Sequence, residues 1–287
     1  MLAADKIHGD DTPVPVLAPG TGKTATGRLW AYVRDDRPWA SEAPPAVFYC
    51  YSPDRKAIHP QSHLGGFRGI LQADGYAGFG ELYRSGAVSE VACWAHVRRK
   101  FFDIHKANGA PLALAALDRI GALYAIEEDA RGLPPEVRRA IRQSRAGPLI
   151  EELRTWMEAS LRRISGKSEL AGAIRYALTR WRQLTRYRDD GRLEIDNNAA
   201  ERAIRALFLG RKNWLFAGSD DGGERAAAIY TLTETAKLNR IDPAAWLIDV
   251  LARLATHPAK RIDELLPWHW AAAQGRNAFT EGAGSPR

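Results

Sequence analysis

The first hundred residues consist of short strand-like segments, and this feature limits the folds open to the chain more than any other. Val, Ile, Tyr, Phe and Trp are concentrated in brief runs separated by Gly and Pro, which is typical of strands joined by turns. The third run, Ala46–Tyr51, is continuously apolar and predicts a strand covered on both faces. The runs that predict strands are 7–17, 28–33, 46–51, 69–75 and 88–97.

Pro13 and Pro15 restrict where the first of these strands can pair. Proline has no backbone N–H, so a central strand cannot hold both residues in a fully paired ladder. We therefore expect the pairing of segment 7–17 to end, or to be broken by a bulge, at the two prolines. The glycines and threonines of 20–27 predict a hairpin turn into the second strand.

A long block of helices follows the predicted sheet. From about 101 to 188, Leu, Ala, Arg and Glu dominate, and apolar residues recur every three or four positions. Pro134-Pro135 and Gly147-Pro148 are expected to divide this block into several helices. Further helices are predicted at 223–239 and from Asp242-Pro243 onward, where an acceptor side chain precedes a proline. This order predicts an α/β core interrupted by a helical insertion.

Length and charge are those of a folded protein with an anionic partner. The 287 residues exceed the usual size of one domain and fit one core with one inserted or appended subdomain. Apolar residues make up 45% of the chain and charged residues 26%, so a sizeable core can be buried. The 41 Lys and Arg residues outnumber the 34 Asp and Glu residues, which gives a net charge of +7. This excess favours partners such as nucleic acid, although an ordinary basic enzyme can also carry it.

Cysteine usage and the N-terminus favour the cytoplasm. Cys50 and Cys93 show neither paired metal-ligand spacing nor a disulfide-dense stretch, which fits a reducing compartment. The first residues lack a basic region followed by an apolar stretch, and nowhere do about eighteen apolar residues follow one another. Neither secretion nor membrane insertion is predicted.

Three carboxylates occupy positions from which a fold could bring them together. Asp10 and Asp74 are on predicted strands, whereas Glu201 is about one turn inside a predicted helix. Carboxylate oxygens suit Mg²⁺ and Mn²⁺, and a pair of such ions can activate the attacking oxygen and stabilise the leaving oxygen of a phosphodiester. Taken alone, Asp10 and Asp74 are better explained by roles in turns or caps.

The helix that carries Glu201 begins near 196, where Asp196 or Asn197 is a suitable cap. Asn197, Glu201 and Arg205 are spaced by four residues and therefore share one face of this helix. Arg205 is thus a candidate contact for a phosphate beside the metal ions. The alternative is a surface ion pair between Glu201 and Arg205.

Basic residues before and after this helix are candidate DNA contacts. One group follows the predicted strand 88–97 with aromatic residues interleaved, as expected of an edge that contacts phosphates. A second group follows the helix in a glycine-flanked segment that is not a Walker-type nucleotide loop. A solvated surface or simple turns are the alternatives. The candidate contacts are Arg98, Arg99, Lys100, Arg205, Arg211, Lys212, Asn213 and Trp214.

No zinc site is predicted. The conceivable ligands are Cys93, His96, His59 and His63. They lack the paired, closely spaced arrangement that is usual in structural zinc sites.

Six segments, in order over nearly the whole chain, resemble the transposases of insertion-sequence family 66. They are His8-Gly-Asp-Asp-Thr-Pro-Val-Pro-Val-Leu17, Gly27-Arg-Leu-Trp30, Leu71-Gln-Ala-Asp-Gly-Tyr76, Cys93-Trp-Ala-His-Val-Arg-Arg-Lys-Phe101, Ile195-Asp-Asn-Asn-Ala-Ala-Glu-Arg202 and Gly210-Arg-Lys-Asn-Trp-Leu-Phe-Ala-Gly-Ser219. The resemblance implies a DDE-type enzyme with a ribonuclease-H-like mixed sheet. It also implies that Asp10, Asp74 and Glu201 are the catalytic acids and bind two Mg²⁺ or Mn²⁺ ions.

Two features depart from the family pattern. Family members commonly read Asp-Glu where this chain has Asp10-Asp11, so Asp11 remains a rival for the first acid. Strand alternation would point one of the two away from the metals. Family members also carry helical and zinc-binding segments before the first acid, so we expect this chain to lack that N-terminal part.

The resemblance also implies an organisation and a function. We expect a catalytic core at 1–103, a helical insertion at 104–190, a completing helix and DNA-contact loop at 191–228, a C-terminal helical element at 229–272 and a disordered tail at 273–287. The implied reaction is cleavage at transposon ends followed by strand transfer into target DNA.

The expected partner is double-stranded DNA, bound by a homo-oligomer in the cytoplasm at the nucleoid, and the need for accessory proteins of the same element stays open. Two other functions remain as alternatives. One is a truncated, catalytically silent DNA-binding remnant, and the other is a host nuclease that reuses the same core.

Overall fold

A mixed five-stranded sheet with the order β3-β2-β1-β4-β5 forms the centre of the protein. The computed structural model describes residues 1–210 and 214–275. β1 runs antiparallel to β2 and parallel to β4, β3 is antiparallel to β2, and β5 is parallel to β4. The sheet confirms the predicted α/β class. The strands are β1 (Lys6–Ala18), β2 (Lys23–Arg34), β3 (Ala46–Ser52), β4 (Gly69–Ala73) and β5 (Val88–Val91).

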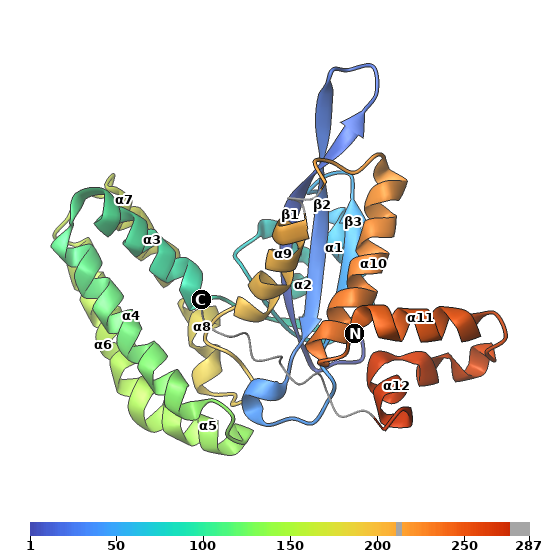
Figure 1. The fold of residues 1–287 in the computed structure, drawn as a ribbon. Helices are drawn as coiled ribbons and strands as arrows, with labels where there is room; N and C mark the ends of the chain where they lie inside the picture. Colours follow the sequence, from blue (N-terminus) through green and yellow to red (C-terminus); the bar gives the residue numbers. More distant parts are fainter. Residues whose placement is uncertain (211–213, 276–287) are drawn as a thin grey trace, which may run out of the picture.

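At its prolines β1 pairs with β2 but not with β4, and the ladder to β2 continues through Pro13 and Pro15 without the end or bulge that the sequence predicts. β1 pairs with β4 only over Lys6–Gly9, whereas its pairing with β2 continues to Ala18. Pro13 and Pro15 therefore face a side of β1 that β4 does not reach. Ala217 covers part of this side, since its N–H donates to Pro15 O (2.9 Å) and its O accepts from Leu17 N (2.8 Å). The β1–β2 hairpin projects beyond the rest of the sheet (Figure 1).

Helices cover both faces of the sheet. On one face, α9 (Asn198–Gly210) and α10 (Asp220–Leu238) bury a cluster that includes Val14, Ala31 and Leu207. On the other face, Ile7, Trp30 and Leu71 pack with Leu64 and Phe79 beside the short helices α1 (Ile58–His63) and α2 (Gly80–Arg84). Consecutive residues of β1 therefore point into different clusters.

β3 is an edge strand, and the prediction that both its faces are covered is wrong. Phe48 is 44% exposed, whereas Val47 and Tyr49 are buried against α10. Threonines of α10 bond to the outer edge of the strand: Thr231 Oγ1 accepts from Tyr49 N (2.9 Å), and Thr235 Oγ1 donates to Val47 O (2.9 Å). These bonds satisfy edge groups that would otherwise be open to another strand.

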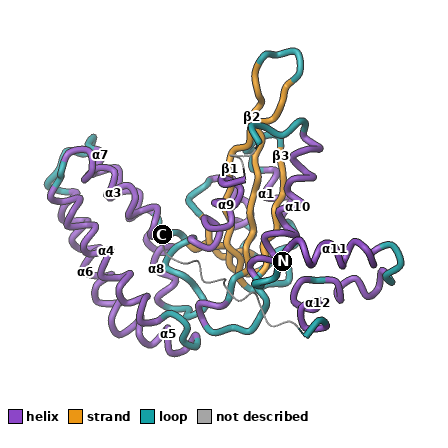
Figure 2. Tube along the Cα trace, viewed as in Figure 1, coloured by secondary structure: helices purple, strands orange, loops and turns teal. Residues whose placement is uncertain are grey.

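The predicted helical insertion is present as a bundle beside the sheet (Figures 1 and 2). Its core contains Ile120, Leu123, Ile150 and Met157, all fully buried. The predicted break at Pro134-Pro135 occurs, but none occurs at Gly147-Pro148, because a π turn at 142–146 leads directly into the next helix. The helices are α3 (Trp94–Asn108), α4 (Pro111–Ala130), α5 (Pro135–Ile141), α6 (Gly147–Leu161), α7 (Glu169–Thr179) and α8 (Trp181–Thr185).

The fifth strand is shorter than predicted. β5 ends at Val91, and residues 94–97 belong to α3, whose buried residues Trp94, Val97, Phe101 and Ile104 recur at helical spacing. Arg98, Arg99 and Lys100 are thus on a helix and not at a strand end. The expected boundary between core and insertion, at 103 and 104, falls inside α3.

The C-terminal helices pack against one another beside α10. α11 (Pro243–Leu254) begins as predicted, with Asp242 Oδ1 accepting from Ala244 N at 2.8 Å. Trp246 and Trp270, the latter on α12 (Pro267–Ala273), are buried in their shared core. The expected tail lies largely at 276–287, outside the described residues. Within 1–210 and 214–275, every helix is too short or too polar to cross a bilayer.

Candidate active site

Asp10 lies on the face of β1 that α9 covers. It is opposite Ala31 of β2 and four residues before Val14, and both neighbours belong to the cluster beneath α9. Its Oδ1 accepts a hydrogen bond from Asp11 N at 2.8 Å. Burial raises the pKa of Asp10 to about 7, and the negative charges of Asp74, Asp11 and Glu201 add to the rise. Burial is therefore the main cause of the raised pKa of Asp10, and the charges of three other carboxylates contribute less.

Asp11 points to the opposite face and is already paired. Its Oδ1 lies 2.8 Å from Arg55 Nη2, and its Oδ2 accepts from Arg28 Nη1 at 3.1 Å. The one-residue offset of a strand thus separates the two candidates for the first acid. Asp10 faces α9, and Asp11 faces a pair of guanidinium groups.

Asp74 lies beside Asp10 at the end of the neighbouring strand. Gly9 and Ala73 are partners in the parallel ladder, so the residues that follow them are neighbours as well. Asp74 Oδ1 accepts from Tyr76 N at 3.0 Å, and its Oδ2 is 3.9 Å from Arg55 Nη2. The insertion reaches this point, since a Cβ added at Gly75 would lie 2.7 Å from Arg180 Nε.

Glu201 projects from the first turn of α9, as predicted, and the start of this helix is tied to β1. Asn197 Nδ2 donates to Gly9 O at 2.9 Å, and Asn197 Oδ1 is 3.1 Å from His8 Nδ1. Asp196 Oδ1 accepts from Asn198 N at 3.0 Å, so Asp196 supplies the capping carboxylate. These bonds place Glu201 above the strand that carries Asp10.

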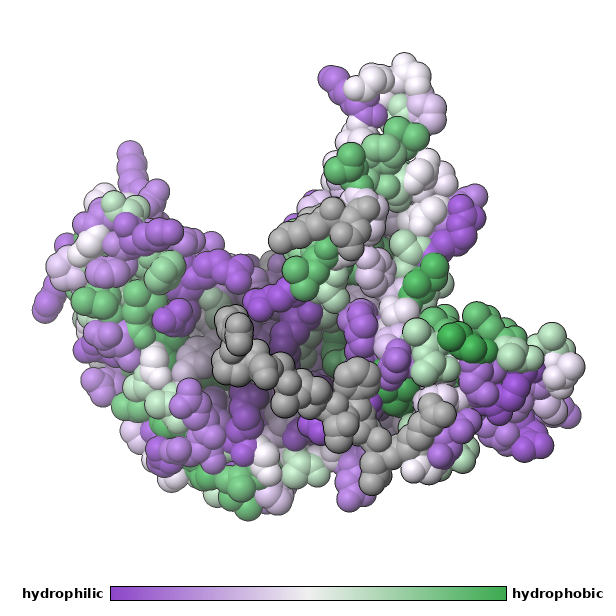
Figure 3. Space-filling model, in the orientation of Figure 1, coloured by the Kyte–Doolittle hydropathy of each residue, from purple (hydrophilic) through white to green (hydrophobic). Residues whose placement is uncertain are grey.

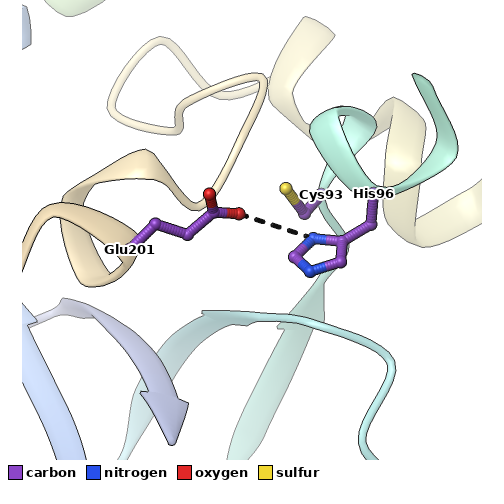
Figure 4. A group of neighbouring side chains, drawn as sticks. All are labelled: Cys93, His96 and Glu201. Carbon is purple, nitrogen blue, oxygen red and sulfur yellow. Dashed lines mark ion pairs between the residues drawn. The ribbon is translucent and has the colours of Figure 1, made fainter. Parts of the chain in front are cut away.

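Figure 4 shows that His96, at the start of α3, points toward Glu201. His96 Nδ1 is 3.8 Å from Glu201 Oε1, and both atoms are buried without a hydrogen-bond partner. Arg99 Nη2 is 3.5 Å from the other oxygen, Glu201 Oε2. Burial lowers the pKa of His96, although the charges of Glu201 and Asp74 act in the opposite direction. His96 is therefore a fourth titratable group at this place.

Cys93 completes a small group of potential ligands with His96 and Glu201. Their donor atoms all lie within 4.8 Å of one another. Cys93 Sγ accepts a hydrogen bond from Asn197 N at 3.2 Å, and burial raises the pKa of its thiol to about 12. The thiol is thus the protonated, hydrogen-bonded member of the group.

By their chemistry the carboxylates of Asp10, Asp74 and Glu201 suit a divalent cation, but among the described residues the group whose donor atoms lie within 4.8 Å of one another is Cys93, His96 and Glu201, without Asp10 or Asp74. Oxygen ligands from Asp10, Asp74 and Glu201 are the donors that Mg²⁺ and Mn²⁺ prefer. A buried carboxylate whose ionisation is opposed by neighbouring carboxylates gains stability from a bound cation. The raised pKa of Asp10 and the unpartnered Glu201 Oε1 are the two observations that indicate such a site.

A groove of about 540 Å³ lies directly beside Glu201. It runs between α3, α4 and the start of α9, and two predicted DNA contacts, Arg98 and Arg99, line it together with Phe102 and Tyr124. Lys100 is oriented differently, since its Nζ lies 4.6 Å from the centre of the Tyr176 ring on α7. The groove therefore joins two guanidinium groups to the carboxylate site.

The other predicted DNA contacts have separate surroundings. Arg205 is exposed on α9, one turn beyond Glu201. Trp214 is half-buried, and its indole Nε1 donates to Tyr230 Oη at 3.4 Å, so this ring packs against α10. Arg211, Lys212 and Asn213 lie outside the described residues.

The sequence does not predict three of the residues at this site. It offers His96 only as a conceivable zinc ligand, and nothing in its local sequence indicates its approach to Glu201. Arg55 approaches Asp74 from a loop, and Arg180 approaches Gly75 from the insertion. The histidines grouped with His96 lie elsewhere, because His59 pairs with Asp54 and His63 with the Tyr32 hydroxyl.

Comparison with known proteins relates the chain to one family. The family model described as "Transposase IS66 family" matches residues 1–225, and "IS66 C-terminal element" matches residues 231–268. No solved structure shows detectable similarity to the chain.

Three curated relatives are uncharacterized proteins of Sinorhizobium fredii. The protein y4hP is 44% identical over 95% of this chain and 52% of its own length. For y4qI the identity is 42%, over 93% of this chain and 51% of the relative. For y4jD the identity is 39%, over 94% of this chain and 54% of the relative. The chain spans about half the length of the curated relatives it matches. Because the first family model matches well over half of the residues, the chain belongs to the IS66 family of transposases.

Proposed function

We propose that the protein is a DDE transposase that cleaves DNA at transposon ends and joins the ends to target DNA, with Asp10, Asp74 and Glu201 as its catalytic acids. The observation that carries this proposal is the position of Asp10, which follows Gly9, the ladder partner of Ala73 before Asp74, and lies beneath α9, the helix of Glu201. The pKa of Asp10 is raised to about 7 by burial and by the carboxylates of Asp74, Asp11 and Glu201. Strongly perturbed carboxylates in a cleft favour a catalytic role over a structural one.

The three acids would hold two Mg²⁺ or Mn²⁺ ions. Bound divalent cations supply Lewis acidity at the attacking and leaving oxygens of a phosphodiester. Asp10 would bind as the carboxylate and release its proton when it does so. Asp74 would be kept in place by the Tyr76 N–H and Glu201 by the anchored start of α9. No covalent intermediate with the protein is required.

A ribonuclease-H-like core is the fold that we propose for this site. The strand order β3-β2-β1-β4-β5, in which only β2 runs antiparallel to the other four strands, supports it. The positions of the acids also support it. Asp10 is on the central strand β1, Asp74 directly follows β4, and Glu201 is on α9, the helix after the insertion. Asp10 rather than Asp11 is the first acid in this proposal, because Asp11 is paired with Arg28 and Arg55.

Double-stranded DNA would enter the hollow between the helical insertion and the sheet. Figure 3 shows hydrophilic residues along the described part of this hollow. Arg98 and Arg99 line the groove next to Glu201, and Arg205 is exposed on the same helix as that acid. The net charge of +7 supports a polyanionic partner. We further propose that the protein acts on DNA as a homo-oligomer at the nucleoid.

The experiment is Mg²⁺- or Mn²⁺-dependent nicking and strand transfer on labelled DNA that carries the flanking element ends. Glu201→Gln keeps the size of the side chain but removes its charge, and it should abolish both steps. Asp11→Asn is the matched control and should retain activity. Salt-sensitive DNA binding without nicking would favour a catalytically silent remnant. Cleavage without preference for the element ends would favour a nuclease.

A further inference from the structure

We propose that His96 is a further protein ligand of the cation bound by Glu201, and that it gives this site a preference for first-row transition-metal ions over Mg²⁺. The inference rests on the proposed function, since it assumes that Glu201 binds a cation. It adds a nitrogen donor to a site that the three acids would otherwise make entirely of oxygen.

The distance between the two side chains suits one shared ion. Ligands at about 2.1 Å from an octahedral ion lie about 3 Å apart when adjacent and about 4 Å apart when opposite. His96 Nδ1 and Glu201 Oε1 are 3.8 Å apart, between these two values and too far for a hydrogen bond. A small movement of either side chain would bring both atoms to one ion.

Both atoms also lack any other partner. Buried polar atoms in folded proteins nearly always have one, and His96 Nδ1 and Glu201 Oε1 are exceptions that face each other. The second oxygen, Oε2, is directed to Arg99 Nη2 at 3.5 Å. Glu201 thus directs one oxygen to a cationic side chain and the other to His96.

The backbone holds His96 in this position. Trp94 N donates to Ile195 O at 3.1 Å, and Asn197 N donates to Cys93 Sγ at 3.2 Å. These two bonds fix the start of α3 against the start of α9. Because the ring and the carboxylate come from two connected helix starts, binding does not need either segment to become ordered.

A nitrogen ligand changes which cations the site favours. Mg²⁺ prefers oxygen donors and keeps much of its water, whereas imidazole nitrogen is a common ligand of first-row transition-metal ions. The thiol of Cys93 is not required, since it already accepts the Asn197 hydrogen bond. The site that we propose therefore has one nitrogen and several carboxylate oxygens.

The decisive measurement uses the wild-type chain with Mn²⁺ alone. Pulsed electron paramagnetic resonance of bound Mn²⁺ detects coupling to a directly ligated ¹⁴N nucleus. We expect imidazole coupling in the wild type and in the control His59→Ala. His59 pairs with Asp54, five residues before it, and not with Glu201. Bound Mn²⁺ without nitrogen coupling, or no bound Mn²⁺, would overturn the assignment, whatever the variants do.

Titrations of three variants then identify the ligand. His96→Ala should lose the coupling and weaken Mn²⁺ binding at least about tenfold, the effect that losing even an outer-shell partner has, while Mg²⁺ binding changes less. Cys93→Ser should keep the coupling and the affinity. If Cys93→Ser weakens Mn²⁺ binding and a folded His96→Ala does not, the thiol is the ligand and the proposal is wrong.

The same measurements separate this inference from the proposed function. Glu201→Gln should abolish Mn²⁺ binding at the His96 site. Metal-dependent DNA cleavage without nitrogen coupling would leave the three-acid enzyme intact and remove His96 from it. Nitrogen coupling in a chain that never cleaves DNA would leave the metal site intact and contradict the transposase reaction.

Discussion

Asn197 donates a hydrogen bond from Nδ2 to the carbonyl oxygen of Gly9, at 2.9 Å, and this bond joins the start of α9 to the residue before Asp10. The same side chain contacts His8 Nδ1 through its Oδ1, at 3.1 Å. Both partners are buried, and neither bond can be replaced by bulk water. The distance between Glu201 and Asp10 therefore depends on a residue that is itself neither acidic nor catalytic.

Replacing this residue should cost both stability and activity. Asn197→Ala leaves the Gly9 carbonyl and the His8 ring without partners, and each unsatisfied buried group costs about 1–3 kcal/mol. We expect the free energy of unfolding to fall by about 2–4 kcal/mol in urea titrations. Cleavage should fall by about 100-fold even where the variant is fully folded, because small displacements of reacting groups have effects of this size.

Asn239→Ala is the matched control. Asn239 Nδ2 also donates to two carbonyls, Pro45 O and Thr235 O, but it lies at the end of α10, away from the acids. This variant should lose stability without losing cleavage per folded molecule. Equal loss of activity in both variants would show that Asn197 acts only through global stability.

Asp10→Asn should stabilise the metal-free protein above neutral pH. The folded-state pKa is about 7 and the model-peptide value is 3.8, so between these limits the folded protein keeps a proton that the unfolded chain has released. Stability contributed by this group therefore falls as the pH rises from about 4 to 7, and the loss is complete above pH 7. In EDTA at pH 8, Asp10→Asn should raise the free energy of unfolding by about 1–4 kcal/mol.

Three comparisons test the origin of this effect. At pH 4 the difference between wild type and Asp10→Asn should disappear, because both side chains are then neutral in the folded state. Mn²⁺ should raise the melting temperature of the wild type and not of the variant. Asp11→Asn should not stabilise the protein at any pH, because it removes ion pairs with Arg28 and Arg55. A stabilising Asp11→Asn would reverse the assignment of the first acid.

The sequence was sufficient for features that depend on local periodicity. Alternation in β1 predicted the strand and the separation of Asp10 from Asp11. The Asp242-Pro243 start of α11 also followed from the capping chemistry of two adjacent residues. In each case the determining interactions lie within one element or one turn.

Features that depend on distant contacts could not be predicted. Residues 88–97 contain apolar side chains spaced by three as well as an extended run, so the local pattern is compatible with a strand or a helix. β5 ends at Val91 because Trp94 packs against Trp181 and its N–H bonds to Ile195 O, contacts made across the whole insertion. The approach of His96 to Glu201 depends on the same contacts, which is why the sequence did not predict it.

A buried ion pair in the insertion should be essential for the fold around the site. Arg142 is fully buried and binds both oxygens of Glu127, at 2.8 and 2.6 Å. It also donates to the carbonyls of Tyr187 and Leu193, in the segment that leads to α9. Arg142→Met leaves Glu127 buried with only its 3.7 Å ion pair to Arg138 and should cost about 3–5 kcal/mol in denaturant titrations.

Arg145→Met tests whether burial is the cause. Arg145, three residues after Arg142, forms a 2.8 Å ion pair with Asp129 of α4, but both side chains are about half exposed. Exposed pairs contribute about 0–1 kcal/mol, so this variant should be nearly as stable as the wild type. Equal losses in Arg142→Met and Arg145→Met would contradict the role given to the buried network.

The salt dependence of DNA affinity should change when arginines near Glu201 are replaced. Each phosphate contact made by Arg98 or Arg205 releases condensed counterions, so removing one should lower the slope of log affinity against log salt by about 0.9. Arg98→Ala and Arg205→Ala should each weaken binding to any duplex to a similar degree, since phosphate contacts carry no sequence information. Lys237→Ala on α10, whose side chain pairs with Glu234, should leave the slope unchanged. If all three variants keep the wild-type slope in fluorescence anisotropy titrations, these arginines are only a solvated surface, and DNA must approach the three acids along another face.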